Sequence, residues 1–241
     1  FENAVQESMK SQRMKAELIT NVSHDIKTPL TSIINYVDLL KQENIQNSKA
    51  EEYIEILDNK SQRLKKLTED LVEASKISTG NISLKLEKIN VVELIKQATG
   101  EFEDKFKKHE LEVIVNSADD EINIMADSRY MYRIIENLYS NISKYALENS
   151  RVYIDVKRNG KKAFSDVQNL SIEMKNISKD RLNISAEELM QRFVRGDKSR
   201  TTEGSGLGIS IAQNLTELQN GKFELTLDGD LFKVKMEFVE V

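Results

Sequence analysis

The chain has 241 residues and a formal net charge of −5 at pH 7, so it lacks the basic surface that marks nucleic-acid binders. It contains no cysteine, which excludes both disulfides and thiolate metal sites. Hydrophobic residues make up 39% and charged residues 31%, with no tryptophan, and this balance favours helical bundles with charged outer faces over an all-β protein.

The N-terminal third predicts two helices. Residues 1–44 contain no glycine and read as one long helix with a bend near Pro29, and residues 48–76 form a second helix after a polar break. Each helix carries a seam whose members are spaced three or four residues apart. The first seam is Ile19, Val22, Ile26, Leu30, Ile33, Val37 and Leu40, and the second is Ile54, Leu57, Ser61, Leu64, Thr68, Leu71 and Ser75.

These two helices predict an antiparallel hairpin, because the break between them is short. One hairpin buries little surface, and the small polar residues of its second seam weaken it further. Two copies would bury both seams in a four-helix bundle, so we predict a homodimer. The alternative is that the seams contact the second half of the same chain.

His24, one of two histidines, is expected to point away from the first seam. It lies two residues from both Val22 and Ile26, and two helical steps turn a side chain by about 200°. Asp25 is adjacent, and Thr28 shares its face one turn later. An exposed imidazole beside a carboxylate and a hydroxyl is a candidate reactive surface. The alternative is a solvated histidine near a helix kink caused by proline.

The turn at residues 78–81 predicts a domain boundary, with a hairpin domain at 1–79 and a second domain at 80–241. In the second domain, alternating apolar residues predict strands and amphipathic stretches predict helices. We expect strands at 84–86, 111–115, 152–156, 172–174, 222–227 and 231–238, and helices at 91–108, 128–147, 186–193 and 206–219. The fold class is therefore α+β: a helical hairpin, then an α/β sandwich of mixed sheet and helical layer.

A glycine-rich run, Gly204-Ser-Gly-Leu-Gly208, opens the helix expected at 206–219. Glycines let backbone amides approach an anion, and a helix N-terminus adds partial positive charge, so this run is a candidate phosphate site. The loop at 195–202 before it carries three cations that could meet phosphates. The alternatives are a loop that needs positive φ and an ordinary solvated surface loop.

The helix expected at 128–147 carries Asn137, Asn141 and Lys144 on one face, at spacings of four and three. Amide oxygens are hard ligands suited to Mg²⁺, and a lysine can contact a phosphate. Helix capping or surface exposure would explain any one of these residues without a ligand.

Four motifs, in chain order, resemble those of sensor histidine kinases, and the resemblance covers nearly the whole chain. The segment 23–30 is similar to the family's H-box, and 136–145, which contains Asn137 and Tyr145, is similar to its N-box. Residues 192–195 resemble the F-box and 204–208 the G2 box. The resemblance implies the ATP-binding fold shared with gyrase, Hsp90 and MutL.

Site roles follow from the resemblance alone. It implies that His24 is the phosphoacceptor, Asp25 its acid/base and Thr28 a residue for phosphatase activity toward the regulator. It implies that Asn141 with Asn137 serves Mg²⁺. It further implies contacts to ATP from a larger set: Asn137, Asn141, Lys144, Tyr145, Asn176, Phe193, Arg195, Gly204, Gly206, Leu207 and Gly208.

One motif departs from the family. The family's Asp-x-Gly-x-Gly is replaced here by Asn176-Ile-Ser-Lys-Asp180, so the aspartate has become asparagine and both glycines are gone. An asparagine carbonyl can accept a hydrogen bond from the adenine amino group, but without a charge, so we expect weaker ATP binding.

The resemblance implies a protein-histidine kinase that uses Mg-ATP, phosphorylates His24 and passes the phosphoryl group to an aspartate on a response-regulator receiver domain. No nucleic-acid partner is expected. No apolar run reaches the roughly 18 residues of a membrane span. The chain starts at Phe1, so we expect the cytoplasmic part of a longer protein that has a membrane sensor upstream. Two alternatives remain: an ATPase of the same fold, and a degenerate kinase that serves as a binding scaffold.

Overall fold

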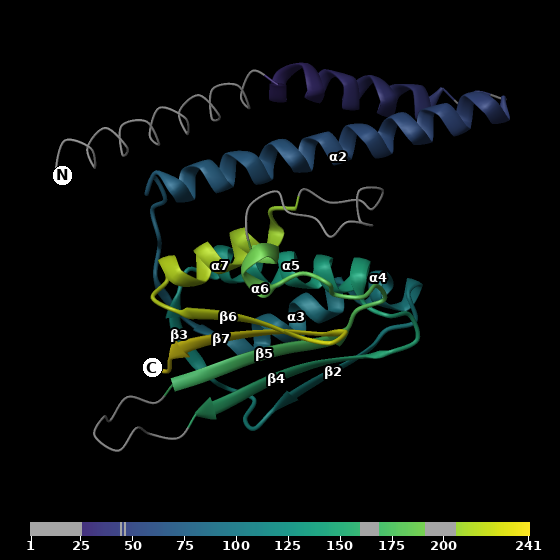
Figure 1. Ribbon diagram of the computed structural model, residues 1–241. Coiled ribbons are helices and arrows are strands. Elements are labelled where there is room, and N and C mark those ends of the chain that lie inside the picture. The colour runs from purple at the N-terminus through teal and green to yellow at the C-terminus, as the bar shows by residue number, and fades with distance from the viewer. Residues whose placement is uncertain (1–25, 44, 46, 160–168, 191–205) are drawn as a thin grey trace. The chain divides into compact units, whose positions relative to one another are not determined.

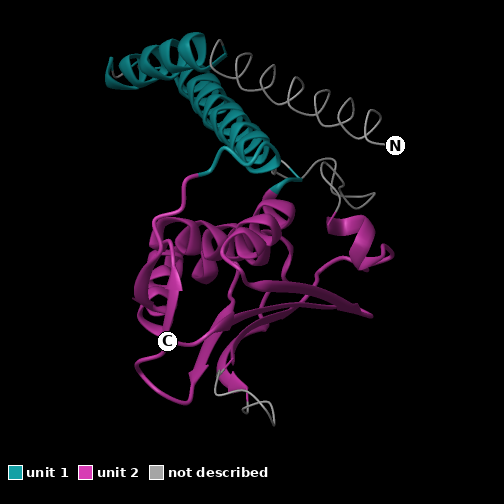
Figure 2. Ribbon diagram, turned by 90° about the vertical axis from the view of Figure 1, so that its left-hand side faces the viewer, with its two compact units in different colours: residues 1–82, 203–207 teal, residues 83–202, 208–241 magenta. Residues whose placement is uncertain are grey.

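The computed structural model describes residues 26–43, 45, 47–159, 169–190 and 206–241. The chain divides into two compact units, residues 1–82 with 203–207 and residues 83–202 with 208–241 (Figure 2). Each unit is described by itself below.

The first unit is a helical hairpin, as predicted. Residues 26–42 are helical, and helix α2 (Ser48–Ser78) runs beside them in the opposite direction (Figure 1). Asn47 caps α2, because its side-chain oxygen accepts from the backbone N–H groups of Lys49 and Ala50. An ion pair between Lys41 and Asp58 links the two helices. No described helix is both long and apolar enough to cross a membrane.

The two seams of the hairpin separate into buried and exposed positions. In α2, the buried members recur every seven residues, and they are Ile54, Ser61, Thr68 and Ser75. The alternate members Leu57 and Leu64 stay 49% and 43% exposed. In the first helix, Leu30 and Val37 are buried, whereas Ile33 and Leu40 are 47% and 41% exposed. One hairpin therefore leaves half of each apolar seam in contact with solvent.

The second unit contains two sheets. The larger has the strand order β2-β4-β5-β7-β6, with β2 parallel to β4 and every other pair antiparallel. Its strands are β2 (Glu112–Ser117), β4 (Arg151–Asn159), β5 (Asn169–Ile177), β6 (Lys222–Asp228) and β7 (Leu231–Val239). The smaller sheet pairs β1 (Glu87–Asn90) with β3 (Asn123–Ala126) in antiparallel register.

A helical layer covers one face of the larger sheet (Figure 1). It contains α3 (Val91–Glu101), α4 (Glu103–Lys108), α5 (Ser128–Tyr145), α6 (Ala186–Met190) and α7 (Gly208–Leu218). Strand side chains alternate between the two faces, and the core between the layers is dense and apolar. Its fully buried members include Ile134, Leu138, Ile154, Ile172, Leu215, Val234 and Met236. This arrangement confirms the predicted α/β sandwich.

Two element predictions for the second unit were wrong, and one strand was not predicted. The strand expected at 84–86 lies instead at β1, where Ile89 pairs with Ile124 of the unpredicted strand β3. The single helix expected at 91–108 is divided at Phe102, whose buried ring packs near Phe106 and Tyr139. In both cases a partner distant in sequence decides the local conformation, and periodicity cannot reveal it.

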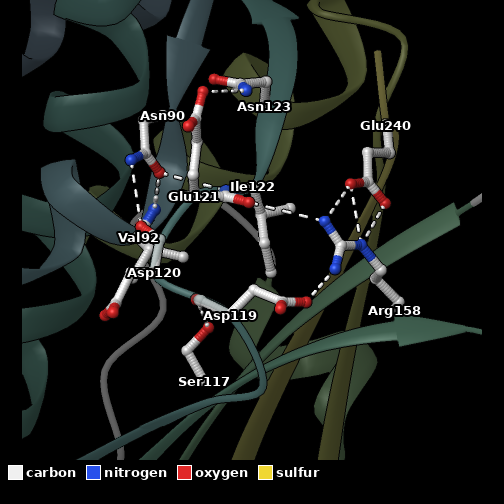
Figure 3. A network of polar contacts seen from close by, with 10 residues as sticks. All are labelled: Asn90, Val92, Ser117, Asp119, Asp120, Glu121, Ile122, Asn123, Arg158 and Glu240. Carbon is white, nitrogen blue, oxygen red and sulfur yellow. Dashed lines mark hydrogen bonds and ion pairs between the residues drawn. The ribbon is translucent and has the colours of Figure 1, made fainter.

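A polar network fixes the connection between β2 and β3 (Figure 3). The guanidinium of Arg158 donates to both carboxylate oxygens of Glu240 and to Asp119. Asn90 accepts from the backbone of Val92 and Ile122, and its amide nitrogen donates to the carbonyl of Asp120. Every polar atom of the Asn90 side chain is therefore engaged, as expected for a purely structural asparagine.

Candidate functional site

Helix α5 carries the polar face that the sequence singled out. Asn137 is buried at 5% exposure, and Asn141 and Lys144 on the following turns are half-buried. Apolar neighbours on the same helix, Ile134 and Leu138, are fully buried in the core. The helix therefore holds Asn137 at the edge of the core, where a polar side chain needs a partner.

The glycine-rich run meets α5 through its last residue. Gly208 begins α7, and a Cβ built on it would lie 3.5 Å from Asn137 Oδ1, in ordinary van der Waals contact. Gly206 adopts φ of +71°, a conformation that favours glycine. Leu207 between them is buried. The start of α7 thus lies against the amide of Asn137, where helix N–H groups can bind an anion.

The end of β5 lies beside the C-terminus of α5. Ile177 O accepts from Leu147 N at 2.8 Å, and Lys179 N donates to Tyr145 O at 2.9 Å. Asn176 is 4% exposed and lies on the same strand face as the buried Ile172 and Met174, toward the helical layer. Asn176 and the polar face of α5 therefore belong to one region of the second unit.

Two buried side-chain atoms in this region have no hydrogen-bond partner among the described residues: Asn137 Nδ2 and Asn176 Oδ1. Leaving such an atom unsatisfied costs about 1–3 kcal/mol, so native proteins seldom bury one without a ligand or water to meet it. An acceptor at Asn176 suits the amino group of adenine, and polar groups beside Gly208 suit phosphates. The residues fit a purine nucleotide.

The polar face of α5 also offers side-chain oxygens of the kind that Mg²⁺ prefers. Within the described ranges, no three His, Cys, Asp or Glu side chains gather into a metal site. Two amides one turn apart on α5, Asn137 and Asn141, offer hard oxygen ligands. Mg²⁺ commonly takes few protein ligands and completes its shell with nucleotide phosphates and water.

The opposite end of α5 holds a polar node, defined here as Lys85, Asp127, Arg129 and Gln219. Asp127, 1% exposed, caps the helix and accepts from Lys85 N at 2.8 Å and from Arg129 N at 3.1 Å. Its own N–H donates to Gln219 Oε1 at 2.8 Å. Hydrogen bonds from the Arg129 side chain, with help from Lys85, outweigh burial and lower the pKa of Asp127 to about 2.

Several predicted site residues lie outside the described residues: His24, Asp25, Phe193, Arg195 and Gly204. Thr28 lies on the first helix of the hairpin and is exposed. The sequence did not predict the backbone hydrogen bond from Leu147 N to Ile177 O, which links the segment after α5 to the end of β5. This pairing could be found only from the fold, because thirty residues separate its two members.

Two protein-family models match the chain. The model described as His Kinase A (phospho-acceptor) domain matches residues 14–80. The model described as Histidine kinase-, DNA gyrase B-, and HSP90-like ATPase matches residues 126–238. The first match lies in the hairpin unit and the second contains the whole polar face of α5.

Curated relatives match over most of the chain. Sensor protein VanS of Enterococcus faecium is 28% identical over 92% of this chain and 56% of its own length. Sensor histidine kinase WalK of Bacillus subtilis is 27% identical over 90% of this chain and 35% of its own length. The chain therefore spans between about a third and a little over half of these relatives.

Solved structures share the fold. Full-length ShkA in complex with AMPPNP aligns with a TM-score of 0.75 at 18% identity, over 93% of this chain and 46% of that chain. Histidine kinase ThkA in complex with the response regulator protein TrrA aligns with a TM-score of 0.60 at 20% identity, over 100% of this chain and 67% of that chain. At these identities the likeness concerns the fold.

Proposed function

The chain belongs to the sensor histidine kinases, and we propose that it binds Mg-ATP and transfers the γ-phosphoryl group to its own His24. The observation that carries this proposal is the buried amide of Asn137 beside Gly208 at the start of α7: its Nδ2, a donor without a partner among the described residues, suits a phosphate oxygen, and its Oδ1 is the atom suited to Mg²⁺. The contact between these two packed helices supports the proposal, because it brings an amide oxygen close to the N-terminus of α7.

Phosphoryl transfer needs positioning and charge neutralisation more than covalent chemistry from the protein. Asn137 and Asn141 would hold Mg²⁺, which when bound neutralises charge on the phosphates. Lys144 would contact a phosphate directly. The neutral imidazole of His24 supplies the attacking nitrogen, and Asp25 accepts or orients the proton on the other ring nitrogen.

Incubation of the full chain with γ-labelled ATP tests the proposal against its alternatives. A kinase gives acid-labile phosphate on the protein, an ATPase of the same fold releases phosphate only, and a scaffold does neither. His24→Gln should abolish the label and leave nucleotide binding intact. His109→Gln is the matched control, since the chain's other histidine contacts Glu148 and should be dispensable. Label that persists in His24→Gln would refute His24 as the acceptor.

We further propose that the phosphoryl group passes to an aspartate of a response-regulator receiver domain, and that Thr28 supports removal of phosphate from that regulator. Thr28 is exposed and follows His24 by four residues in the sequence, a spacing at which a helix would let its hydroxyl position a water. Thr28→Ala should slow dephosphorylation of the regulator and keep kinase activity. In the control, Thr31→Ala, the lost hydroxyl donates to Lys27 O within its own helix. Equal loss of both activities in Thr28→Ala would indicate damage to the helix instead.

We also propose that the hairpin forms a homodimeric four-helix bundle, since Ile33, Leu40, Leu57 and Leu64 remain exposed in one copy. Leu64→Lys would bury an unpaired charge in the bundle and should split the dimer, as light scattering would report. Asn59→Lys adds the same charge at another exposed position of α2 and should leave the mass unchanged. An unchanged mass in both variants would place the dimer interface elsewhere. By analogy with relatives named as sensors, we place the chain on the cytoplasmic side of a membrane sensor.

A further inference from the structure

Helices α5 and α7 pack against each other in opposite directions, and two contacts lie far apart along the pair. At one, Gly208 at the start of α7 lies against Asn137. At the other, Gln219, which directly follows the last residue of α7, accepts from Asp127 N at 2.8 Å through its Oε1. About ten residues of each helix separate the two contacts, which is about 15 Å at a rise of about 1.5 Å per residue. Because the two spans match, a shift of α7 along α5 at one contact must appear at the other.

The side chain of Gln219 is 3% exposed, and both of its polar atoms are engaged. Its Oε1 accepts from Asp127 N, and its Nε2 donates to Leu215 O at 3.0 Å. Rotating the amide by half a turn would set Nε2 against Asp127 N, so two donors would face each other. Asp127 is held in turn, because its carboxylate accepts from Lys85 N and Arg129 N. Gln219 therefore joins the end of α7 to a fixed point at the start of α5.

Other polar side chains of α7 bond within their own helix. Gln213 donates to Glu217, and Asn214 and Thr216 donate to backbone carbonyls one turn earlier. These bonds stabilise α7 but do not fix its place along α5. The apolar contacts between the two helices are non-directional, whereas a hydrogen bond is sensitive to both distance and angle. The bond from Asp127 N to Gln219 is thus the kind of contact that opposes sliding.

We propose that Gln219 is a positioning residue for the phosphate end of the candidate site. It holds α7 in register along α5, so that Gly208 stays beside Asn137 at the other end of the pair. A displacement of about 1 Å in a group that positions a substrate is enough to weaken a reaction strongly. The inference rests on the proposed function, because it assigns a support to the same nucleotide site. Gln219 acts through α7, since its side chain lies about 15 Å along the helix from Gly208.

Hydrogen exchange on the full chain without nucleotide gives the first test. Gln219→Met keeps the length of the side chain but loses the bonds to Asp127 and Leu215. Thr216→Val is the matched control, because Thr216 is fully buried and its hydroxyl bonds only within the helix in the contact described above. Urea is added to the more stable variant until both have the same free energy of unfolding. We expect the amides of residues 208–214 to exchange at least fivefold faster in Gln219→Met, because the start of α7 is released. Equal exchange in the two variants would overturn the proposal.

Calorimetry of ATP binding with Mg²⁺ and with EDTA gives the second test. The quantity compared is the factor by which Mg²⁺ tightens ATP binding, because a general loosening of the fold would weaken ATP in both conditions alike. We expect Gln219→Met to lower this factor at least fivefold and Thr216→Val to leave it unchanged. Gln219→Asn draws the amide back by one methylene, should lower the factor in the same direction, and serves if the methionine variant does not fold.

The two tests separate failure of this inference from failure of the proposed function. If the wild type binds Mg-ATP and the factor is the same in all variants, Gln219 does not position the site and the proposed function survives. If the wild type binds no ATP in either condition, the proposed function is refuted and this inference with it.

Discussion

The two ends of the region around α5 treat buried polar groups in opposite ways. At the start of the helix, Asp127 is 1% exposed and its carboxylate is met by Lys85 N and Arg129. At the middle of the helix and beside its C-terminal end, Asn137 and Asn176 are nearly as buried, yet each has one atom with no partner among the described residues. The satisfied polar groups at the start of α5 stabilise the fold, and we propose that the unsatisfied atoms of Asn137 and Asn176 are met by the nucleotide.

Under the proposed function, the first group stabilises the free protein and the second stabilises its complex with nucleotide. A buried hydrogen bond that is made contributes roughly 1 kcal/mol, or 1.5–3 kcal/mol when one partner is charged. A buried polar atom that lacks a partner costs a similar amount until a ligand supplies one. Substitutions at the two ends should therefore move unfolding and nucleotide binding in different proportions.

Asp127→Ala should give the largest effect, a fall of about 3 kcal/mol in the free energy of unfolding of the second unit. The substitution removes the cap of α5 and the charge-assisted bonds to Arg129 and Lys85 together. Urea unfolding followed by near-ultraviolet circular dichroism measures it, since Tyr139 lies buried against Phe102 and Phe106.

Arg129→Ala is the matched control for that experiment. Its side chain is 70% exposed, so removing its half of the ion pair should cost well under 1 kcal/mol. If Asp127→Ala costs no more than Arg129→Ala, the polar node does not hold the start of α5 in place.

Asn137→Ala should weaken Mg-ATP binding by about 2 kcal/mol, roughly thirtyfold, because a ligand to a charged group is lost. Without nucleotide, its free energy of unfolding should stay level or rise, since an unsatisfied buried amide is removed. Calorimetry and urea unfolding on the same samples give both numbers.

Asn90→Ala is the contrasting substitution, because every polar atom of Asn90 is already bonded within the fold (Figure 3). It should lower stability by about 1–2 kcal/mol and leave nucleotide affinity unchanged. A comparable loss of stability in Asn137→Ala would mean that Asn137 is structural as well.

Lowering the pH should remove the contribution of the Asp127 carboxylate to stability, an effect smaller than those of the substitutions above. Its pKa is about 2 in the folded chain against an ordinary value of 3.8, so the folded state favours the charged form. This contribution is complete above about pH 4 and is lost as pH falls toward 2. Asp127→Asn should therefore flatten the decline of the urea midpoint between pH 4 and pH 2.5. An unchanged slope would assign the acid sensitivity to other carboxylates, such as Asp155. Burial alone would raise the pKa of Asp155, but hydrogen bonds from Lys175 and Asn116 outweigh it and lower that pKa to about 2.

Local patterns predicted much of this fold and little of its register. The alternation at 231–238 and the helix from Asp127 onward were readable, because each buries one regular face. The short strand β3 was missed, since Asn123–Ala126 shows no long alternation and its strand pairing depends on β1, more than thirty residues away. The break at Phe102 was missed for the same reason: it follows from packing in the aromatic cluster.

The candidate site shows the same limit. Spacing alone placed Asn137, Asn141 and Lys144 on one face of a helix, and the roles of these residues stay predictions. The approach of Gly208 to Asn137 joins residues about seventy positions apart, and the bond between Leu147 and Ile177 joins α5 to β5. Such contacts follow from sheet order and layer packing, which no single stretch of sequence contains.

Asn176→Asp should have the smallest effect on ATP affinity. It tests whether the Asn176 side chain stabilises the fold, the nucleotide complex or both. From the sequence alone, restoring the family's aspartate should tighten ATP by roughly 1 kcal/mol, the scale of one improved hydrogen bond. The structure adds an opposing effect, because the second carboxylate oxygen would replace Nδ2, which lies 3.2 Å from Ile177 O, and would repel that carbonyl. We therefore expect a change in ATP affinity of less than about threefold and a fall of about 1 kcal/mol in the free energy of unfolding. Calorimetry and urea unfolding of this variant beside the wild type measure the two quantities. Tenfold tighter ATP with unchanged stability would show that the bond from the Asn176 amide nitrogen to Ile177 O does not contribute to the stability of the fold.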